Sequence, residues 1–396
     1  MTKRNFYFKL SSIVISGIIT AGFILEIFSI KHFSLTYPYN LIVILVIVIS
    51  LISTRIIFKK TFFFRWFSSL ENSLVIIAAF ILLNLISAFI PHQQASDGFI
   101  NKLSLNKIIN SYPFIFTYLY LIFTLGLVIL RRINGNFSIR NIAFFLNHFG
   151  LWIILVGAGF GSADFVRLDM IVKLNNTVWY GYTEKDEIKE LPFAIELKEF
   201  HMKTFTPKLQ IIKVDSNLNN FKVIKQLQLD TIKFIRYKGI RIKTLQYVPY
   251  AWFINSDSVV QMKAPGYVNA AYVRIDFGDQ VNEGWVSNSS LMQKGKYLPL
   301  YNGFYLTLSE PIPKDYISYI KVYTSNQEIF DTIVKVNKPV NVMGWNIYQK
   351  DYNKYLGEYS DYSVFEVNKD PWLWFVYSGI IMLAIGAIML IFVIKY

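Results

Sequence analysis

The sequence predicts a polytopic α-helical membrane protein of about six spans that carries a large extracytoplasmic, mostly antiparallel β domain. Three observations predict this class. The 396-residue chain is 54% hydrophobic, which is more apolar than an ordinary soluble protein of two domains. Six stretches are long and apolar enough to cross a bilayer as helices, which takes roughly 17–25 such residues. Between the fifth and the sixth stretch the hydrophobic pattern changes to an alternation of two residues, the period of β-strands.

Five expected spans follow one another in the first 160 residues, and the sixth closes the chain. They are Leu10–Ile30, Tyr39–Ile57, Ser73–Ile90, Pro113–Leu130, Ile142–Phe160 and Trp372–Ile394. The chain therefore divides into a membrane domain at 1–161 with five spans, a β-rich domain at 162–371 and a last spanning helix at 372–396. The first apolar run is longer than a signal-peptide core and no small-residue cleavage pattern follows it, so we interpret it as a retained anchor.

The formal net charge of +14 is explained by membrane topology and not by nucleic-acid binding. Residues 1–160 contain 13 basic and three acidic residues, so +10 of the charge lies beside the spans. Basic clusters precede the first span, follow the second and separate the fourth from the fifth, and the positive-inside rule places them in the cytoplasm. Both termini are therefore expected inside and the β domain outside. The clusters are Lys3, Arg4 and Lys9; Arg55, Lys59, Lys60 and Arg65; and Arg131, Arg132 and Arg140.

The segment between the last two spans contains short stretches with strand periodicity. They are Phe193–Phe200, Leu209–Val214, Lys238–Val248, Ala271–Phe277, Phe304–Leu308, Ser318–Tyr323 and Trp345–Gln349. Clusters of turn-forming residues separate them, at Asp215–Asn220, Asn282–Gly284 and Pro311–Lys314. This pattern is typical of an antiparallel sandwich or open barrel. The chain has no cysteine, which excludes disulfides, thiolate ligation of haem and iron–sulfur clusters.

One ionisable residue stands out inside the expected spans. His148 is eight residues beyond Arg140, about 12 Å along a helix and near the middle of the membrane. Ionisable groups at that depth are costly and usually pair with a group or bind one. A neutral imidazole is a good iron ligand, so His148 is a candidate axial ligand for haem. The alternative is that it hydrogen-bonds a neighbouring helix, with Asn147 beside it.

Glycines on the same span favour a close approach by a partner helix or by a flat ligand. Gly157 and Gly161 are four residues apart, and Gly150 and Gly159 add further small surfaces. Packing within the chain is the simpler interpretation of this pattern, because glycine is common in spanning helices.

The other three histidines and Glu26 carry weaker signals. His32 and His92 each follow an outward helix end, so they would form a second metal or haem site or be merely solvated. His201 lies in the β domain without a companion ligand and is expected on the surface. Glu26 is expected near the outer end of the first span, paired with Lys31. A hydrolase elbow, a phosphate loop, a dinucleotide fingerprint and a zinc HExxH helix are all absent from the sequence. These observations favour binding and positioning over self-contained catalysis.

Two stretches resemble the ResB family of System II cytochrome c biogenesis. The first is VNKPVNVMGWNIYQKDY at 336–352, followed by YSVFEVNKDPWLWFVYSGIIMLAIGAIML at 362–390. Members of the family similarly have a strand with a G-[WY]-x-[FIL]-Y-Q element, another strand, an Asp-Pro at the membrane entry and a final glycine-containing helix. The second is NHFGLWIILVGAGFGSADFVRLDM at 147–170, and LPFAIELKEF and TPKL extend it. Together the stretches cover about a quarter of the chain.

The resemblance implies a role in handling haem. ResB-like proteins associate with a ResC-type (CcsA-like) membrane partner, move haem to the outer side of the bacterial cytoplasmic membrane and help present it to apocytochrome c. Haem b would be bound transiently, and the partner carries the tryptophan-rich haem-binding motif that this chain lacks. In related fused proteins the ResB part contributes a membrane-embedded histidine, and His148 matches that description. The chain would then be a non-catalytic subunit of a holocytochrome c synthase complex.

The sequence also allows two other functions. The chain could be a non-catalytic scaffold whose β domain binds a partner or apocytochrome without ligating haem, or an envelope transporter or enzyme unrelated to haem. Neighbouring genes for a ResC-like protein and c-type cytochromes would disfavour the third function. The haem spectrum of the purified complex, with and without His148, would separate the first function from the scaffold.

Overall fold

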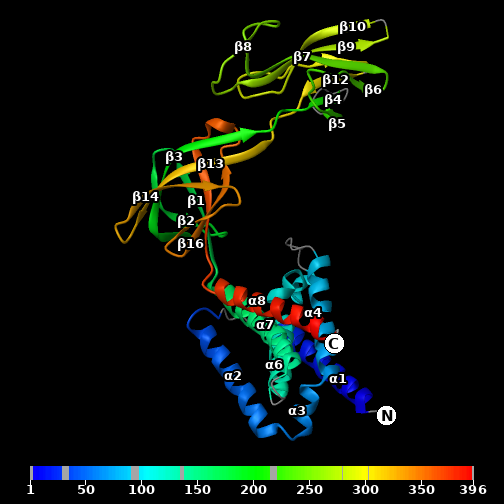
Figure 1. The fold of residues 1–396 in the computed structure, drawn as a ribbon, viewed down its shortest axis with the longest axis vertical. Helices are drawn as coiled ribbons and strands as arrows, with labels where there is room; N and C mark the ends of the chain where they lie inside the picture. Colours follow the sequence, from blue (N-terminus) through cyan, green and yellow to red (C-terminus); the bar gives the residue numbers. More distant parts are fainter. Residues whose placement is uncertain are drawn as a thin grey trace. The chain divides into compact units, whose positions relative to one another are not determined.

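The computed structural model describes residues 3–28, 35–90, 98–133, 138–214, 221–278, 280–301 and 303–394. The chain forms two compact units, one of residues 1–166 and 370–396 and the other of residues 167–369. The first unit is helical and the second is built from strands (Figure 1). Its helical elements are α1 (Lys3–Ile27), α2 (Tyr39–Phe58), α3 (Phe62–Phe67), α4 (Leu70–Phe89), α5 (Phe99–Lys102), η1 (Leu105–Asn110), α6 (Tyr112–Arg132), α7 (Ile139–Gly161), η2 (Ser162–Asp164) and α8 (Leu373–Ile394).

Six helices in the described part of the chain are long and apolar enough to cross a membrane: α1, α2, α4, α6, α7 and α8. Each overlaps one of the six expected spans, so the predicted fold class is confirmed. Hydroxyl side chains begin two of these helices, since Ser69 accepts a hydrogen bond from the Asn72 amide and Ser138 accepts one from the Asn141 amide. These caps satisfy amides that have no partner within the helix.

The most extensive helix contact joins α7 to α8, although more than 200 residues separate them in the sequence. The whole β unit is inserted between these two helices. The contact is close because glycines face it from both sides. A Cβ at Gly386 would lie 2.3 Å from the Asn147 backbone nitrogen, and a Cβ at Gly150 would lie 2.6 Å from the Leu383 backbone nitrogen. Neither distance allows a side chain, so the two backbones are in direct contact.

The β unit contains an eight-stranded antiparallel sheet in the order β14-β13-β3-β2-β1-β17-β16-β15. Its strands are β1 (Val166–Lys173), β2 (Thr177–Tyr182), β3 (Ile188–Thr204), β13 (Pro313–Thr324), β14 (Ile329–Lys335), β15 (Val340–Val342), β16 (Trp345–Tyr352) and β17 (Tyr362–Lys369). The sheet curls into a barrel. Only residues 336–339 link the two edge strands β14 and β15. The hydroxyls of Ser318 on β13 and Ser363 on β17 lie 2.7 Å apart, although three strands separate β13 from β17 in the sheet.

Alternation along the strands forms the interior of this barrel. On β1, Leu168, Met170 and Val172 are at most 1% exposed, while Arg167 and Asp169, which alternate with them, point to the other face. Phe365 and Val367 on β17 are also fully buried. Burying side chains of this kind stabilises the fold by roughly 1.5–3 kcal/mol each.

Two smaller sheets are inserted between β3 and β13 and pack on each other as a sandwich. One has the order β10-β9-β7-β6, with β8 paired to β7, and the other has the order β11-β12-β4-β5. A shared core joins them, made by alternate residues of β4, β7, β9, β10 and β12 such as Ile211, Ile242 and Val273, all 0% exposed. The strands are β4 (Leu209–Val214), β5 (Phe221–Leu227), β6 (Ile235–Tyr237), β7 (Ile240–Phe253), β8 (Val259–Gln261), β9 (Val268–Phe277), β10 (Gln280–Ser287), β11 (Leu298–Pro299) and β12 (Phe304–Leu308).

The sequence located some of these boundaries and missed others. The expected strands at 209–214 and 304–308 are β4 and β12 to the residue. The expected turn at Asn282–Gly284 is wrong, because these residues lie inside β10 and pair with β9 in regular register. Long antiparallel pairing outweighs the turn preference of Asn and Gly here. The expected turn at Asp215–Asn220 lies outside the described residues.

Candidate functional site

The imidazole of His148 lies on α7, half-buried, in the helical unit. Its Nδ1 is 3.0 Å from the backbone carbonyl oxygen of Phe144, one turn earlier in the same helix. A carbonyl only accepts hydrogen bonds, so Nδ1 carries the proton and Nε2 carries the lone pair in the neutral ring. Nε2 has no hydrogen-bond partner among the residues that the structure describes. Metal-binding histidines commonly have this arrangement, with one nitrogen donating to a carbonyl and the other free to coordinate.

The sequence left open whether His148 hydrogen-bonds a neighbouring helix. In the structure Asn147 makes that contact, because its Nδ2 donates to the Leu383 carbonyl on α8 at 3.4 Å. His148 bonds within its own helix instead. The two adjacent side chains therefore have different roles. Asn147 donates a hydrogen bond across the α7–α8 contact, and His148 donates one within α7.

A chain of contacts runs from the His148 ring to Phe144, Arg132 and Asn141, toward the start of α7. The ring of Phe144 is stacked on it, with centroids 3.7 Å apart and an interplanar angle of 24°. The guanidinium of Arg132, at the end of α6, lies over the same Phe144 ring with its Cζ 4.2 Å from the centroid. Arg132 Nε donates to Asn141 Oδ1 at 3.2 Å, which ties the ends of the two helices together. The cluster combines a free imidazole nitrogen, an aromatic face and a cation.

The glycines of α7 are not open to a ligand. Gly150 and Gly157 face α8, Gly161 faces the Trp372 ring, and Gly159 faces the Tyr118 ring on α6. A Cβ at any of these positions would lie 3.2 Å or less from an atom of the neighbouring helix or ring. Of the two alternatives for these glycines, the structure therefore supports packing within the chain and not room for a flat ligand. A ligand at His148 would use a different face of the helix.

Of the other three histidines, His201 is the one that the structure describes. His32 and His92 lie outside the described residues. His201 on β3 is exposed, with its Nε2 2.9 Å from Glu199 Oε2 and its ring edge-on to Tyr319. Within the described ranges, no group of three or more His, Asp or Glu side chains is arranged to hold a metal ion. One imidazole can still provide a single axial position to an iron whose other ligands come from a porphyrin and from elsewhere.

Sequence reasoning missed a carboxylate clamp around Asp164, at the point where α7 leads into the β unit. The Asp164 carboxylate accepts hydrogen bonds from the Tyr37 amide, from Asn40 Nδ2 and from Trp372 Nε1, each at 2.7 Å. The donors belong to the start of α2 and to the residue just before α8. The clamp therefore joins three helices where the chain leaves the helical unit and where it returns. The only sequence signal was Trp372 beside Pro371, which does not identify Asp164 as its partner.

Glu26 has a structural partner set of its own. Its side chain is 6% exposed, and its two carboxylate oxygens accept from Ser104 Oγ and from the Tyr112 amide, each at 2.7 Å. Tyr112 is the first residue of α6, so the negative charge lies at the positive end of that helix dipole. The expected partner Lys31 lies outside the described residues.

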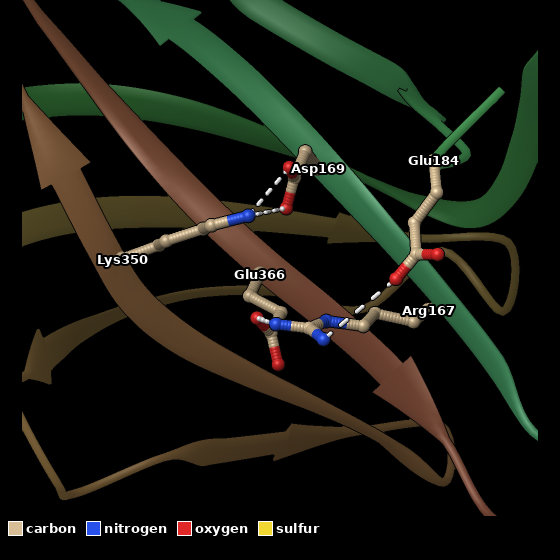
Figure 2. A network of polar contacts seen from close by, with 5 residues as sticks. All are labelled: Arg167, Asp169, Glu184, Lys350 and Glu366. Atoms are coloured by element: carbon tan, nitrogen blue, oxygen red, sulfur yellow. Dashed lines mark hydrogen bonds and ion pairs between the residues drawn. The ribbon is translucent and has the colours of Figure 1, made fainter. Parts of the chain in front are cut away.

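The outer face of the barrel carries an exposed network of ion pairs (Figure 2). Lys350 Nζ contacts both carboxylate oxygens of Asp169 at 2.6 and 2.7 Å. Arg167 pairs with Glu366 and lies 3.9 Å from Glu184. The pairs connect β1 to its neighbour β17, to β16 beyond it and to the turn after β2. Mixed signs and exposure identify this face as a solvated sheet surface.

One carboxyl group in the β unit is buried although one of its two oxygens has no partner in the described part of the chain. The Glu358 side chain is 9% exposed, its Oε2 is 3.6 Å from Lys263 Nζ, and its Oε1 has no partner in the described part of the chain. Burial raises the pKa of this carboxyl above its usual range. Lys263 is its ion-pair partner in the described part of the chain, so we interpret Glu358 as a structural contact that is only partly compensated.

These features define a polytopic membrane protein with a β unit. They are the six long apolar helices, the strands inserted between α7 and α8, and the clamp around Asp164. No protein-family model matches the chain, and no curated protein matches it. Among solved structures, the chain is similar to one named "Cytochrome c Heme Lyase CcmF", with 10% identity and a TM-score of 0.22. The alignment covers 81% of this chain and 34% of that one, so this chain spans about a third of its length.

Proposed function

We propose that this protein is a haem-handling subunit of a System II cytochrome c synthase complex. It would help to move haem across the bacterial cytoplasmic membrane and to present it with apocytochrome c for covalent attachment. The observation that carries the proposal is the hydrogen bond between His148 Nδ1 and the Phe144 carbonyl. This bond leaves the Nε2 lone pair of a membrane-embedded imidazole free to ligate iron.

The chemistry of the site suits haem as a cargo. A neutral imidazole binds haem iron at an axial position, and the adjacent Phe144 ring offers an aromatic surface beside it. Haem b would be held transiently, with its second axial ligand supplied by a ResC-like (CcsA-like) membrane partner. The residues of this chain would hold and orient the haem, and the bond-forming chemistry would belong to the complex.

The stretches that resemble ResB coincide with coherent structural elements, which supports the proposal. The G-[WY] element lies in the hairpin of β15 and β16, where Val342 pairs with Trp345 around a two-residue turn. Met343 and Gly344 both have positive φ, 50° and 80°, as such a turn requires. Glycine is therefore favoured at 344 by the backbone. The other resembling stretch contains most of α7 with His148.

The proposal also includes the sidedness of the membrane unit. The basic clusters place both termini in the cytoplasm and the β unit outside, by the positive-inside rule. Reporter fusions truncated after Lys107 and after Ile133 test this directly. The fusion after Lys107 should be active outside the cell membrane, and the fusion after Ile133 should be active inside. The opposite pattern would overturn the assigned sidedness.

The decisive test is replacement of His148 in the complex purified with its membrane partner. His148→Gly should reduce the haem retained by the complex and impair cytochrome c maturation, since the axial ligand is lost. Added imidazole should partly restore both by occupying the vacated position. The measurement is the haem spectrum together with the haem content per complex.

A matched control is His201→Gly, which removes an exposed histidine from β3. It should leave haem content and spectrum unchanged. If His148→Gly assembles with the wild-type haem content and spectrum, ligation by His148 is excluded. The remaining function would then be that of a scaffold that binds its partner or apocytochrome without ligating haem.

A further inference from the structure

Arg132 brings a positive charge close to the candidate ligand His148. Both side chains lie against the ring of Phe144, the imidazole at 3.7 Å between centroids and the guanidinium carbon at 4.2 Å. We infer that Arg132 binds a propionate carboxylate of the haem that His148 ligates. This inference rests on the proposed function and names the group that would orient the haem at the site.

The guanidinium has free donors for an anion. Arg132 Nε donates to Asn141 Oδ1, which anchors the side chain between α6 and α7. An arginine has five N–H donors, and no carboxylate pairs with Arg132 in the described part of the chain. The neighbouring Arg131 differs, because its Nη1 donates to the Ser68 carbonyl at 3.1 Å. Arg131 is therefore committed to the connection between α3 and α4, whereas Arg132 faces the Phe144 and His148 cluster.

The three side chains follow one another from the imidazole toward the start of α7, in the order that an iron and a propionate edge would need. Phe144 is one turn before His148, or about 6 Å along α7, so Arg132 lies toward the start of the helix relative to the imidazole. Haem has an iron at its centre and two carboxylates on one edge. An iron on His148 Nε2 would place that edge within reach of Arg132 if the propionates point toward the start of α7. A planar guanidinium suits a carboxylate because it forms two parallel hydrogen bonds.

The cluster therefore distinguishes haem from an uncharged porphyrin. The apolar ring needs only the aromatic and lipid-facing surface around Phe144. The two anionic groups are stabilised by a cation, and Arg132 provides one in the last turn of α6. Arg132 would thus act as an orienting residue that holds the propionate edge at the N-terminal end of α7, where Arg140 lies.

The test uses the complex of the full-length chain with its membrane partner in lipid nanodiscs, titrated with haem and with haem dimethyl ester, in which both carboxylates are blocked. Affinity is followed through the absorption band of the bound haem. Arg132→Gln should weaken the binding of haem roughly tenfold or more, as expected for loss of a charge-assisted hydrogen bond. It should leave the binding of the ester unchanged. Arg132→Lys should recover part of the loss, and the control Arg131→Gln should bind haem like the wild type.

The outcomes separate this inference from the proposed function. If wild-type protein binds neither form, or if His148→Gly binds haem like the wild type, the proposed function fails and this inference fails with it. If wild-type binding requires His148 but Arg132→Gln weakens haem and ester equally, or neither, only the role of Arg132 is overturned. Should Arg132→Gln not fold, the unaltered protein decides, since equal affinity for haem and its ester would also overturn the inference.

Discussion

Two regions bring together the two ends of the inserted β unit, and they do so by different physical means. One is the contact between α7 and α8, and the other is the charged face of β1, β16 and β17. In the helical contact, glycines allow backbone to touch backbone, and Asn147 adds one hydrogen bond. On the strands, long charged side chains reach across an exposed surface (Figure 2). The first contact has no space to adjust, whereas the second can rearrange in water. We therefore expect very different tolerance to substitution.

The largest expected effect is at the helical contact. Gly386→Leu should destabilise the full-length protein by about 3 kcal/mol or more, since even a Cβ would lie 2.3 Å from the Asn147 backbone nitrogen. Thermal unfolding in detergent measures this. The control is Gly17→Leu on α1, where no atom lies within 4 Å of the added Cβ. Equal stability of the two variants would contradict the close contact.

The Asp164 clamp should come next, because its carboxylate serves three donors at once. Asp164→Ala leaves those donors without their acceptor and should cost about 2–3 kcal/mol. Trp372→Phe keeps a ring against Gly161 but loses one donor, so it should cost about 1 kcal/mol. Unfolding of both variants in detergent gives the comparison. A larger cost for Trp372→Phe than for Asp164→Ala would show that ring packing, and not the carboxylate, holds the clamp.

Glu358 should make the stability of the β unit depend on pH, with a sign opposite to that expected for a well-paired carboxylate. Its pKa is raised by burial, so the folded state favours the protonated acid. Its stabilising contribution is therefore complete below the unfolded pKa and is lost as the pH rises through the folded pKa. Glu358→Gln should stabilise the protein by about 1 kcal/mol at pH 7, and less at pH 5.

Denaturant midpoints of the full-length protein at the two pH values measure this dependence. Glu190→Gln, on an exposed position of β3, is the control and should change neither midpoint. If Glu358→Gln lowers stability at pH 7, the pair with Lys263 outweighs the cost of burial and our interpretation is wrong.

The smallest effect is expected on the charged face. Lys350→Met breaks the pair with Asp169, but both groups are solvated, so the change should be less than about 1 kcal/mol and should shrink with added salt. Unfolding at low and high salt checks both points. A loss comparable to that of Gly386→Leu would remove the contrast between the two regions.

Local periodicity predicted the elements well where one rule dominates. Continuous apolar runs gave all six spanning helices, since hydrocarbon imposes a length and a composition on them. Alternation gave β4 and β12 to the residue. It failed at Asn282–Gly284, where turn-forming residues lie within β10, because pairing along the whole of β9 overrides local preference.

The candidate site was predicted in part. The sequence singled out His148 because an ionisable group in an apolar helix is conspicuous. The sequence did not reveal the hydrogen bond from His148 to Phe144. It also did not reveal the contact of Arg132 with the Phe144 ring, because this contact depends on how α6 packs against α7. The glycines were conspicuous too, but their partner was left open, and α8 lies more than 200 residues away in the chain.

By itself, the sequence determined the class of this protein: six apolar helices, a β segment between the last two and a histidine within the fifth. Composition and periodicity are local properties, so they can be read without knowing which segments meet. Only the tertiary structure decided which groups face each other. The clamp around Asp164 shows the reason, since its donors at residues 37, 40 and 372 are brought to one carboxylate by the packing of α2, α7 and α8.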